Sequence, residues 1–291
     1  MSYPVIDLHM HSSFSDGTDT PEELFEKVKS AAIDIFAITD HDECLGVKKM
    51  LAGVTGGGPM FIAGVEFSCR DEYGKYHVLG YHYDLESEDM LAMFTRFHEL
   101  RLRKAVKRVE WLTSEYGFHF QQAELDELFS HKNPGKPHIA NMVVRNGYAP
   151  DRSTAINNYI STCPYTEYVR PEEAITAIIK GGGIPVLAHG FFGNGEQRNN
   201  PLTACEMETR IIRLKAMGLK GLECFYYGFT KEQTELMLGL KDKHGMFATA
   251  GSDYHGKNKT VRLGDAGPAA IADPERVYKE LQPFLKACGV F

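Results

Sequence analysis

The chain has 291 residues, of which 43% are hydrophobic, enough to fill the core of one large domain or of a domain with an insertion. Its 39 acidic residues exceed its 32 basic ones, which argues against a broad basic surface for duplex nucleic acid or an anionic membrane. No apolar run long enough to cross a membrane, no secretory signal pattern and no disulfide spacing is visible, so we expect a cytoplasmic protein with six reduced cysteines.

Short apolar runs alternate with amphipathic helical patterns along most of the chain. Because strand and helix alternate, the pattern predicts right-handed crossovers and a parallel sheet of the α/β class. Two helices have clear starting signals, since Thr20 with Glu23 and Thr230 with Gln233 each form a capping box. We predict strands at residues 4–11, 35–39, 61–68, 77–83, 184–190, 221–226 and 247–253.

One segment interrupts this alternation. Residues 86–165 begin with a long helical pattern, continue through shorter ones such as PHIANMVVRNG, and contain none of the predicted strands. We therefore expect a main domain of residues 1–85 and 166–291 with an inserted helical subdomain at 86–165.

Histidines and carboxylates lie at or near the ends of six predicted strands. His9 and His11 are two positions apart in the first strand, so their side chains point to the same face, roughly 6.6 Å apart. His77 is the least regular case, because it lies at the start of its apolar run. The loops that follow the strands of a parallel barrel meet on one face, so these side chains are expected to lie together. They are, in chain order, His9, His11, Asp40, His41, Asp42, Glu66, His77, His189, Asp253 and His255.

Imidazole and carboxylate groups without thiolates favour Zn²⁺, Mn²⁺ or Fe²⁺ over Cu⁺ or an iron–sulfur cluster. Asp7, Asp40 and Asp42 adjoin candidate ligands, and we expect them to orient imidazole rings. For Asp42, capping of the following helix is an equal alternative.

The ordered motifs DLHMHSSFSDG, TDHD, GVEFS, HVLGY, LAHG and GSDYH resemble the polymerase and histidinol phosphatase (PHP) family of metal-dependent phosphoesterases. The helical segment with KPHIA resembles the insertion of the small phosphoesterases in that family. The resemblance implies a distorted seven-stranded (β/α) barrel with a small inserted helical subdomain and three divalent metal ions, manganese first, with zinc or iron as alternatives.

The resemblance also implies how the ligands are shared. One ion would be held by His9, His11, Glu66 and Asp253, and a second by Glu66, His77 and His189, with Glu66 bridging. The third ion would be held by Asp16, His41 and His255. Two close ions would provide a bridging hydroxide as the nucleophile and neutralise the phosphoryl oxygens.

Basic residues of the helical segment are candidates for binding the phosphate. Arg101 and Lys104 lie three positions apart on one helical face, and Lys136 and His138 lie in KPHIA. His138 is also a candidate general acid for the leaving alcohol. A solvated charged face and a hydrogen bond to its own turn are the alternatives for the basic pair and for His138.

Two motifs depart from the family pattern, since Gly190 follows His189 in place of Pro and Lys136 precedes Pro137 in place of Arg. Both departures leave the substrate open. We expect hydrolysis of small phosphate monoesters or cyclic phosphodiesters, such as nucleotide or sugar phosphates.

Three alternatives remain open at this point. A 3',5'-bisphosphate nucleotidase or an enzyme acting on the 5' end of a short RNA would use the same chemistry. An amidohydrolase would cleave C–N bonds, but it commonly bridges its metals with a modified lysine, and HVLGYHY contains none. A non-catalytic metal-binding module is disfavoured by nine intact ligands. No membrane contact and no obligate protein partner are expected.

Overall fold

The structure is a computed structural model that describes residues 3–53, 58–131, 134–165, 167–192 and 202–290. The chain divides into two compact units. The barrel unit comprises Met1–Met93 and Val169–Phe291, and the helical unit comprises Phe94–Tyr168. The segment predicted as a helical insertion, residues 86–165, overlaps the helical unit.

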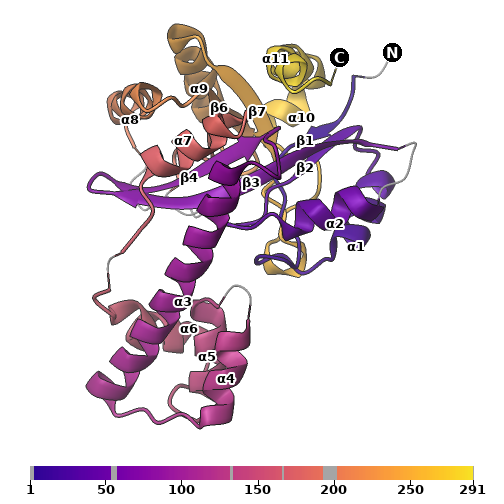
Figure 1. The fold of residues 1–291 in the computed structure, drawn as a ribbon. Helices are drawn as coiled ribbons and strands as arrows, with labels where there is room; N and C mark the ends of the chain where they lie inside the picture. Colours follow the sequence, from indigo (N-terminus) through magenta and orange to yellow (C-terminus); the bar gives the residue numbers. More distant parts are fainter. Residues whose placement is uncertain (1–2, 54–57, 132–133, 166, 193–201, 291) are drawn as a thin grey trace. The chain divides into compact units, whose positions relative to one another are not determined.

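Seven strands form the sheet of the barrel unit, and they neighbour one another in chain order (Figure 1). The first and last strands also meet, since the Leu8 backbone N–H donates to the Ala250 carbonyl over 2.9 Å and Met10 pairs with Tyr254. The result is the nearly closed, distorted seven-stranded barrel that was predicted. The strands are β1 Ile6–Asp7, β2 Ile35–Ile38, β3 Met60–Asp71, β4 Gly74–Tyr81, β5 Ile184–Leu187, β6 Gly221–Tyr226 and β7 Phe247–Gly251.

The prediction of an all-parallel sheet was wrong for β4. This strand runs antiparallel to both β3 and β5, because only two residues separate it from β3. A parallel crossover needs about a dozen residues or more, whereas a hairpin needs only a tight turn. The reversal explains why His77, at the start of its apolar run, can lie with the other candidate ligands. The start of β4 lies beside the carboxyl end of β3, with His77 paired to Ser68.

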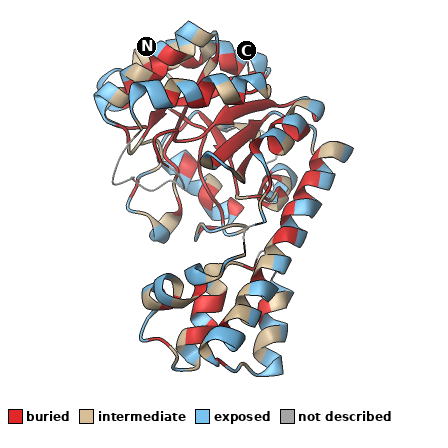
Figure 2. Cartoon of the chain, turned by 90° about the vertical axis from the view of Figure 1, so that its left-hand side faces the viewer, coloured by how far each residue is buried: buried red, intermediate tan, exposed pale blue. Residues whose placement is uncertain are grey.

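Helices in the barrel unit follow the predicted starting signals. Both capping boxes are confirmed, since Thr20 and Thr230 accept hydrogen bonds from the backbone N–H groups of Glu23 and Gln233. The strands are largely buried, as Figure 2 shows in red. The helices are α1 Pro21–Ser30, α2 Leu45–Gly53, α7 Pro171–Lys180, α8 Ala204–Ala216, α9 Lys231–His244, η3 Gly256–Asn258, α10 Pro268–Ala272 and α11 Pro274–Ala287.

The helical unit has an apolar core of its own. Buried residues such as Leu112, Ile139 and Val143 pack with half-buried aromatic side chains, and the Phe118 and Tyr148 rings stack at 4.1 Å. The long helix α3 begins before this unit and ends within it. The helices are α3 Glu88–Tyr116, α4 Gln122–Ser130, α5 Lys136–Arg145, α6 Arg152–Thr154, the π-helix η1 Ala155–Tyr159 and η2 Ile160–Thr162.

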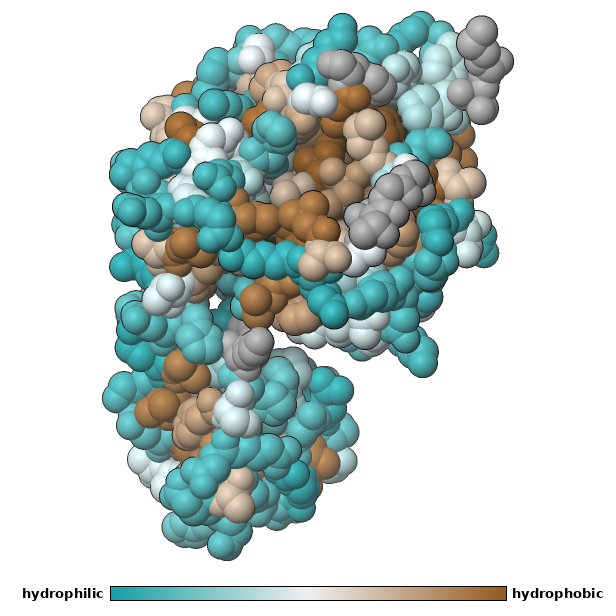
Figure 3. All heavy atoms as spheres, turned by 45° about the vertical axis from the view of Figure 1, so that its right-hand side comes forward, coloured by the Kyte–Doolittle hydropathy of each residue, from teal (hydrophilic) through white to brown (hydrophobic). Residues whose placement is uncertain are grey.

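Hydrophobic side chains gather at the centre of the visible face of the barrel unit, with hydrophilic residues around them (Figure 3). Among the described residues, no helix combines the length and hydropathy needed to cross a bilayer.

Candidate metal centre

The barrel unit carries all nine of the predicted metal ligands, and they come from strands or loops at one end of the barrel. β1 is shorter than predicted, so His9 and His11 lie just after it. Their side chains still point to the same residue, Glu66. Asp16 lies in the loop that follows them, and Glu66 and His77 lie within β3 and β4. His41 follows β2, His189 follows β5, and Asp253 and His255 follow β7.

Glu66 is the centre of this cluster. Its Oε2 lies 3.2 Å from His9 Nε2, 3.1 Å from His11 Nε2 and 3.3 Å from His41 Nδ1. These four atoms are buried and have no hydrogen-bond partner in the described part of the chain. Unpaired buried polar atoms are costly, and their convergence on one point is what a cation between them would relieve. The residues present therefore fit a metal centre.

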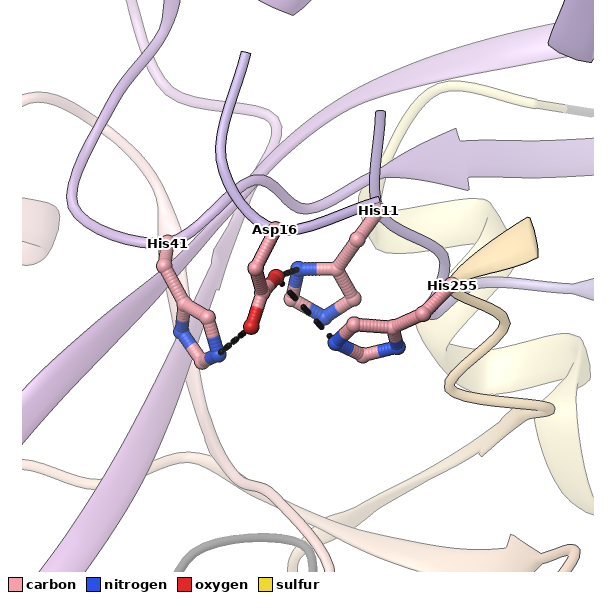
Figure 4. Close-up of side chains that lie close together, drawn as sticks. All are labelled: His11, Asp16, His41 and His255. Atoms are coloured by element: carbon pink, nitrogen blue, oxygen red, sulfur yellow. Dashed lines mark ion pairs between the residues drawn. The ribbon is translucent and has the colours of Figure 1, made fainter. Parts of the chain in front are cut away.

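The candidate ligands form three groups, and within each group the ligand atoms all lie within 4.8 Å of one another. The first is the predicted set His9, His11, Glu66 and Asp253. The second combines His41, Glu66 and His77, and the third adds His11 to the predicted set Asp16, His41 and His255. Figure 4 shows the third group, with the Asp16 carboxylate between the three rings. His11 and His41 thus each belong to two of the groups.

His189 completes the predicted second set. Its Nε2 lies 3.0 Å from Glu66 Oε1 and 3.2 Å from His77 Nδ1, while His77 Nδ1 lies 2.8 Å from the same carboxylate oxygen. The three atoms that the prediction groups around one ion are therefore mutual neighbours.

Backbone carbonyls fix which nitrogen two of the histidines present to the centre. His189 Nδ1 donates to the Phe192 carbonyl over 3.2 Å, and His255 Nδ1 donates to the Asp253 carbonyl over 2.8 Å. The Nε2 atom of each ring is left as the ligand atom. His189 and Asp253 also have φ angles of 26° and 54°, a left-handed conformation that non-glycine residues adopt at a cost and that is typical of functional sites.

The two carboxylate oxygens of Asp253 have different partners: one faces the metal centre, and the other accepts hydrogen bonds from residues outside it. Oδ2 accepts hydrogen bonds from Tyr226 Oη over 2.8 Å and from Lys259 Nζ over 2.6 Å. Oδ1 lies 3.5 Å from His9 Nε2 and 3.3 Å from His11 Nε2. These contacts leave Oδ1 as the ligand atom, and neither Tyr226 nor Lys259 was singled out in the sequence.

Glu223 is a further residue that the sequence analysis missed. It is fully buried on β6, and its carboxylate lies 2.9 Å from His9 Nδ1 and accepts from the His189 backbone N–H over 2.6 Å. The available signal was an acidic residue inside the apolar strand GLECFY, because a charge is buried there only when it has partners.

The expectation that Asp7 and Asp40 orient imidazole rings was wrong. Asp7 accepts from the Ser252 hydroxyl over 2.6 Å, and Asp40 from the Ser12 hydroxyl over 2.6 Å. Both also accept backbone N–H groups of the same serines, so they fix the loops that carry the ligands. Asp42 accepts from the Ser68 backbone N–H over 2.7 Å, which ties its loop to β3.

The electrostatics of the metal-free centre favour ionised carboxylates. Burial works against the charge of Glu66, but the neighbouring imidazoles, His77 first, hold its pKa well below the ordinary value. Burial likewise opposes the imidazolium form of His11, but the neighbouring carboxylates of Asp253 and Glu66 raise its pKa to about 9. His77 differs, because burial outweighs the attraction of Glu66 and lowers its pKa to about 4. A metal ion must therefore displace a proton from His11 but not from His77.

The four residues predicted to bind phosphate lie in the helical unit. Lys104 Nζ lies 4.6 Å from the centroid of the Tyr168 ring, and Lys136 Nζ donates to Ser161 over 2.8 Å. His138 Nδ1 accepts the Gly135 backbone N–H over 3.1 Å, so this ring does bond its own turn. Burial and then the nearby His131, with a contribution from Arg101, lower the pKa of His138. Arg101 therefore lies near enough to His138 to influence its pKa, and the phosphate-binding role of both residues remains a prediction.

Residues 7–148 match the family model of the PHP domain. The chain therefore carries a PHP domain. A solved structure of a proposed metal-dependent phosphoesterase from Bifidobacterium adolescentis shares 28% identity and a TM-score of 0.74 with this PHP protein, and the match covers 98% of both chains.

Two curated relatives have similar lengths. A 5'-3' exoribonuclease from Haemophilus influenzae is 26% identical over 89% of this chain and 92% of its own. A 3',5'-nucleoside bisphosphate phosphatase from Chromobacterium violaceum is 26% identical over 95% of this chain and 96% of its own. The PHP protein is thus similar along nearly its whole length to proteins that act on phosphate esters.

Proposed function

We propose that this PHP protein is a metal-dependent phosphoesterase that hydrolyses small phosphorylated substrates with three divalent ions, manganese first. The observation that carries the proposal is the convergence on Glu66 Oε2 of three buried imidazole nitrogens that have no hydrogen-bond partner among the described residues. Such an arrangement of imidazoles around a carboxylate is typical of a centre in which that carboxylate bridges ions.

When bound, divalent ions of this kind lower the pKa of water and neutralise the charge of a phosphoryl group. The chain's own residues prepare that centre. Glu66 stays ionised among the imidazoles, and the Phe192 carbonyl holds the proton of His189 on Nδ1. Tyr226 and Lys259 hold one oxygen of Asp253, so its other oxygen is directed at His9 and His11.

We assign phosphate binding to Arg101, Lys104, Lys136 and His138 of the helical unit. The Gly135 N–H donates to His138 Nδ1, so Nε2 carries the proton of the neutral ring and is free to donate it. A pKa below the ordinary 6.5 keeps this ring mostly neutral at neutral pH. This favours hydrogen bonding to a phosphate oxygen over a role as general acid.

For the substrate class, we propose nucleotide or sugar phosphates, either monoesters or cyclic diesters. The two curated relatives make a 3',5'-bisphosphate and the 5' end of a short RNA the first compounds to test. Cleavage of C–N bonds has less support, because an amidohydrolase commonly bridges its metals with a modified lysine. The lysine on β4, Lys75, is exposed, whereas Glu66 is buried and surrounded by imidazoles.

We also propose that the protein acts in the cytoplasm. All six cysteines are unpaired, which is typical of proteins from reducing compartments.

The experiment is hydrolysis by the Mn²⁺-reconstituted protein of a panel of nucleotides, bisphosphates, cyclic phosphates, a 5'-phosphorylated oligoribonucleotide and simple amides. We expect phosphate or nucleotide release that is lost in Glu66→Ala and His189→Ala. His244→Ala is a matched control, because its ring binds Glu208 outside the centre. Amide turnover without phosphate-ester cleavage, or full activity in both ligand variants, would overturn the proposal.

A further inference from the structure

β6 carries none of the nine predicted metal ligands, yet its polar side chains contact ligands that come from three other strands. Glu223 bonds His9, after β1, and the backbone of His189, after β5. Tyr226 bonds Asp253, after β7. β6 is therefore placed to hold ligands in position rather than to supply them.

An irregularity in β6 makes both contacts possible. Glu223 pairs with Thr249 of β7, and Phe225 pairs with the very next residue, Ala250, so Cys224 is an extra residue in this strand. Without the extra residue, side chains three positions apart would point to opposite faces. Glu223 and Tyr226 are three positions apart and both contact ligands. Such bulges commonly redirect side chains next to active sites.

The two bonds of Glu223 require two acceptors. One oxygen lies 2.9 Å from His9 Nδ1, and the other lies 2.6 Å from the His189 backbone nitrogen, which can only donate. A carboxylate accepts at both oxygens. In the neutral ring it therefore holds the His9 proton on Nδ1, which leaves Nε2, the atom 3.2 Å from Glu66 Oε2, with a free lone pair.

We infer that Glu223 is a positioning residue that sets the tautomer of His9 and the place of His189, and thereby couples two of the proposed metal sites. The inference rests on the proposed metal centre. Glu223 does not itself touch the converging ligand atoms, so it acts through the two histidines.

Glu223→Gln is the decisive variant, because it keeps the size of the side chain but has only one acceptor oxygen. Whichever way the amide is turned, its NH₂ group faces either His9 Nδ1 or the His189 N–H. The first orientation moves the His9 proton to Nε2, and the second brings two donors together at His189. Either result weakens metal binding, and the usual loss for such partners is about 10–100-fold in affinity.

Thr249→Val is the matched control. Thr249 is buried beside Glu223 on β7, and its hydroxyl has no partner among the described residues, so the change alters the same layer of the barrel without removing a hydrogen bond that the structure shows there.

The experiment has two readouts on the purified full chain. Mn²⁺ titration gives the affinity and number of bound ions, and two-dimensional ¹H–¹⁵N NMR of the imidazoles without metal, at a pH above the raised pKa of His9, gives the His9 tautomer. We expect wild type and Thr249→Val to agree in both, and Glu223→Gln to bind at least one ion about 10-fold or more weakly. An altered His9 tautomer or a shifted His189 amide signal should accompany that loss.

Wild-type Mn²⁺ binding together with unchanged His9 and His189 signals in Glu223→Gln would overturn the inference while leaving the proposed centre intact. Failure of the wild-type protein to bind Mn²⁺ would instead overturn the proposed centre, and the inference with it. Equal losses in Thr249→Val and Glu223→Gln would show a general packing effect and would also refute the positioning role.

Discussion

Replacing Gly251 with alanine is expected to damage the centre through packing alone. Gly251 ends β7, and a Cβ atom there would lie 2.2 Å from the Cβ of His9 and 2.9 Å from Oε1 of Glu223. To reach the 3.4 Å of an ordinary contact, the two carbons must move apart by about 1.2 Å. The methyl group would thus lie against the ligand His9 and its partner, where close packing leaves little room for relaxation.

Two effects follow, and each has a magnitude. Overpacking of this kind costs about 1–3 kcal/mol in the free energy of unfolding. Displacing His9 from Glu223 should weaken Mn²⁺ binding by about 10–100-fold, as loss of such a partner does. Chemical denaturation of the metal-free protein measures the first effect, and calorimetric Mn²⁺ titration measures the second.

Gly239→Ala is the control, because its added Cβ on the exposed side of α9 meets no described atom within 4 Å other than its chain neighbours and the backbone of its own helix. It should leave metal binding unchanged and stabilise the helix by up to about 1 kcal/mol. If Gly251→Ala matched the wild-type protein in both stability and Mn²⁺ affinity, the close contact between β7, His9 and Glu223 would be refuted.

Three further predictions test the substrate clamp and the metal centre. Arg101→Ala should raise KM for phosphorylated substrates about 10-fold or more, which is the cost of losing one hydrogen bond to a charged group. Arg103→Ala should leave KM unchanged, because its exposed side chain pairs with Glu167. Equal KM values in steady-state assays would exclude Arg101 from the phosphate-binding residues. The raised pKa of His11, about 9, means that its ring holds a proton below that pH, so Mn²⁺ affinity should fall as pH drops from 9 to 7, with protons released on binding. Calorimetric titrations in buffers of different ionisation enthalpy measure this, and an affinity independent of pH would contradict it. Finally, chelation should lower the Tm, because an ion at 100 times its Kd stabilises the folded chain by about 2.7 kcal/mol; thermal unfolding curves that coincide with and without chelator would count against a metal centre in the folded protein.

The strand series and the clustering of ligands could be predicted because both depend on local patterns. Each strand is a short apolar run, and most ligands lie at its end, so the barrel gathers them by topology alone. The direction of β4 was missed although the information was present, since the gap between the predicted strands at 61–68 and 77–83 is too short for a parallel crossover.

Contacts between distant segments could not be predicted in this way. Glu223 is 214 positions from His9, and its role depends on a bulge that the letters GLECFY do not reveal. Asp7 and Asp40 adjoin ligands in sequence, yet their carboxylates bind serine hydroxyls and backbone N–H groups. Proximity in sequence identified the centre, but only the fold shows which groups hold it together.

The most direct test of the account is an anomalous difference map from crystals grown with Mn²⁺, recorded near the manganese absorption edge. The account predicts three peaks in the barrel unit, two of them beside Glu66 and the third beside Asp16. A map without peaks beside Glu66, at Mn²⁺ concentrations that support phosphate-ester hydrolysis, would contradict the central claim that these nine side chains form the catalytic metal centre.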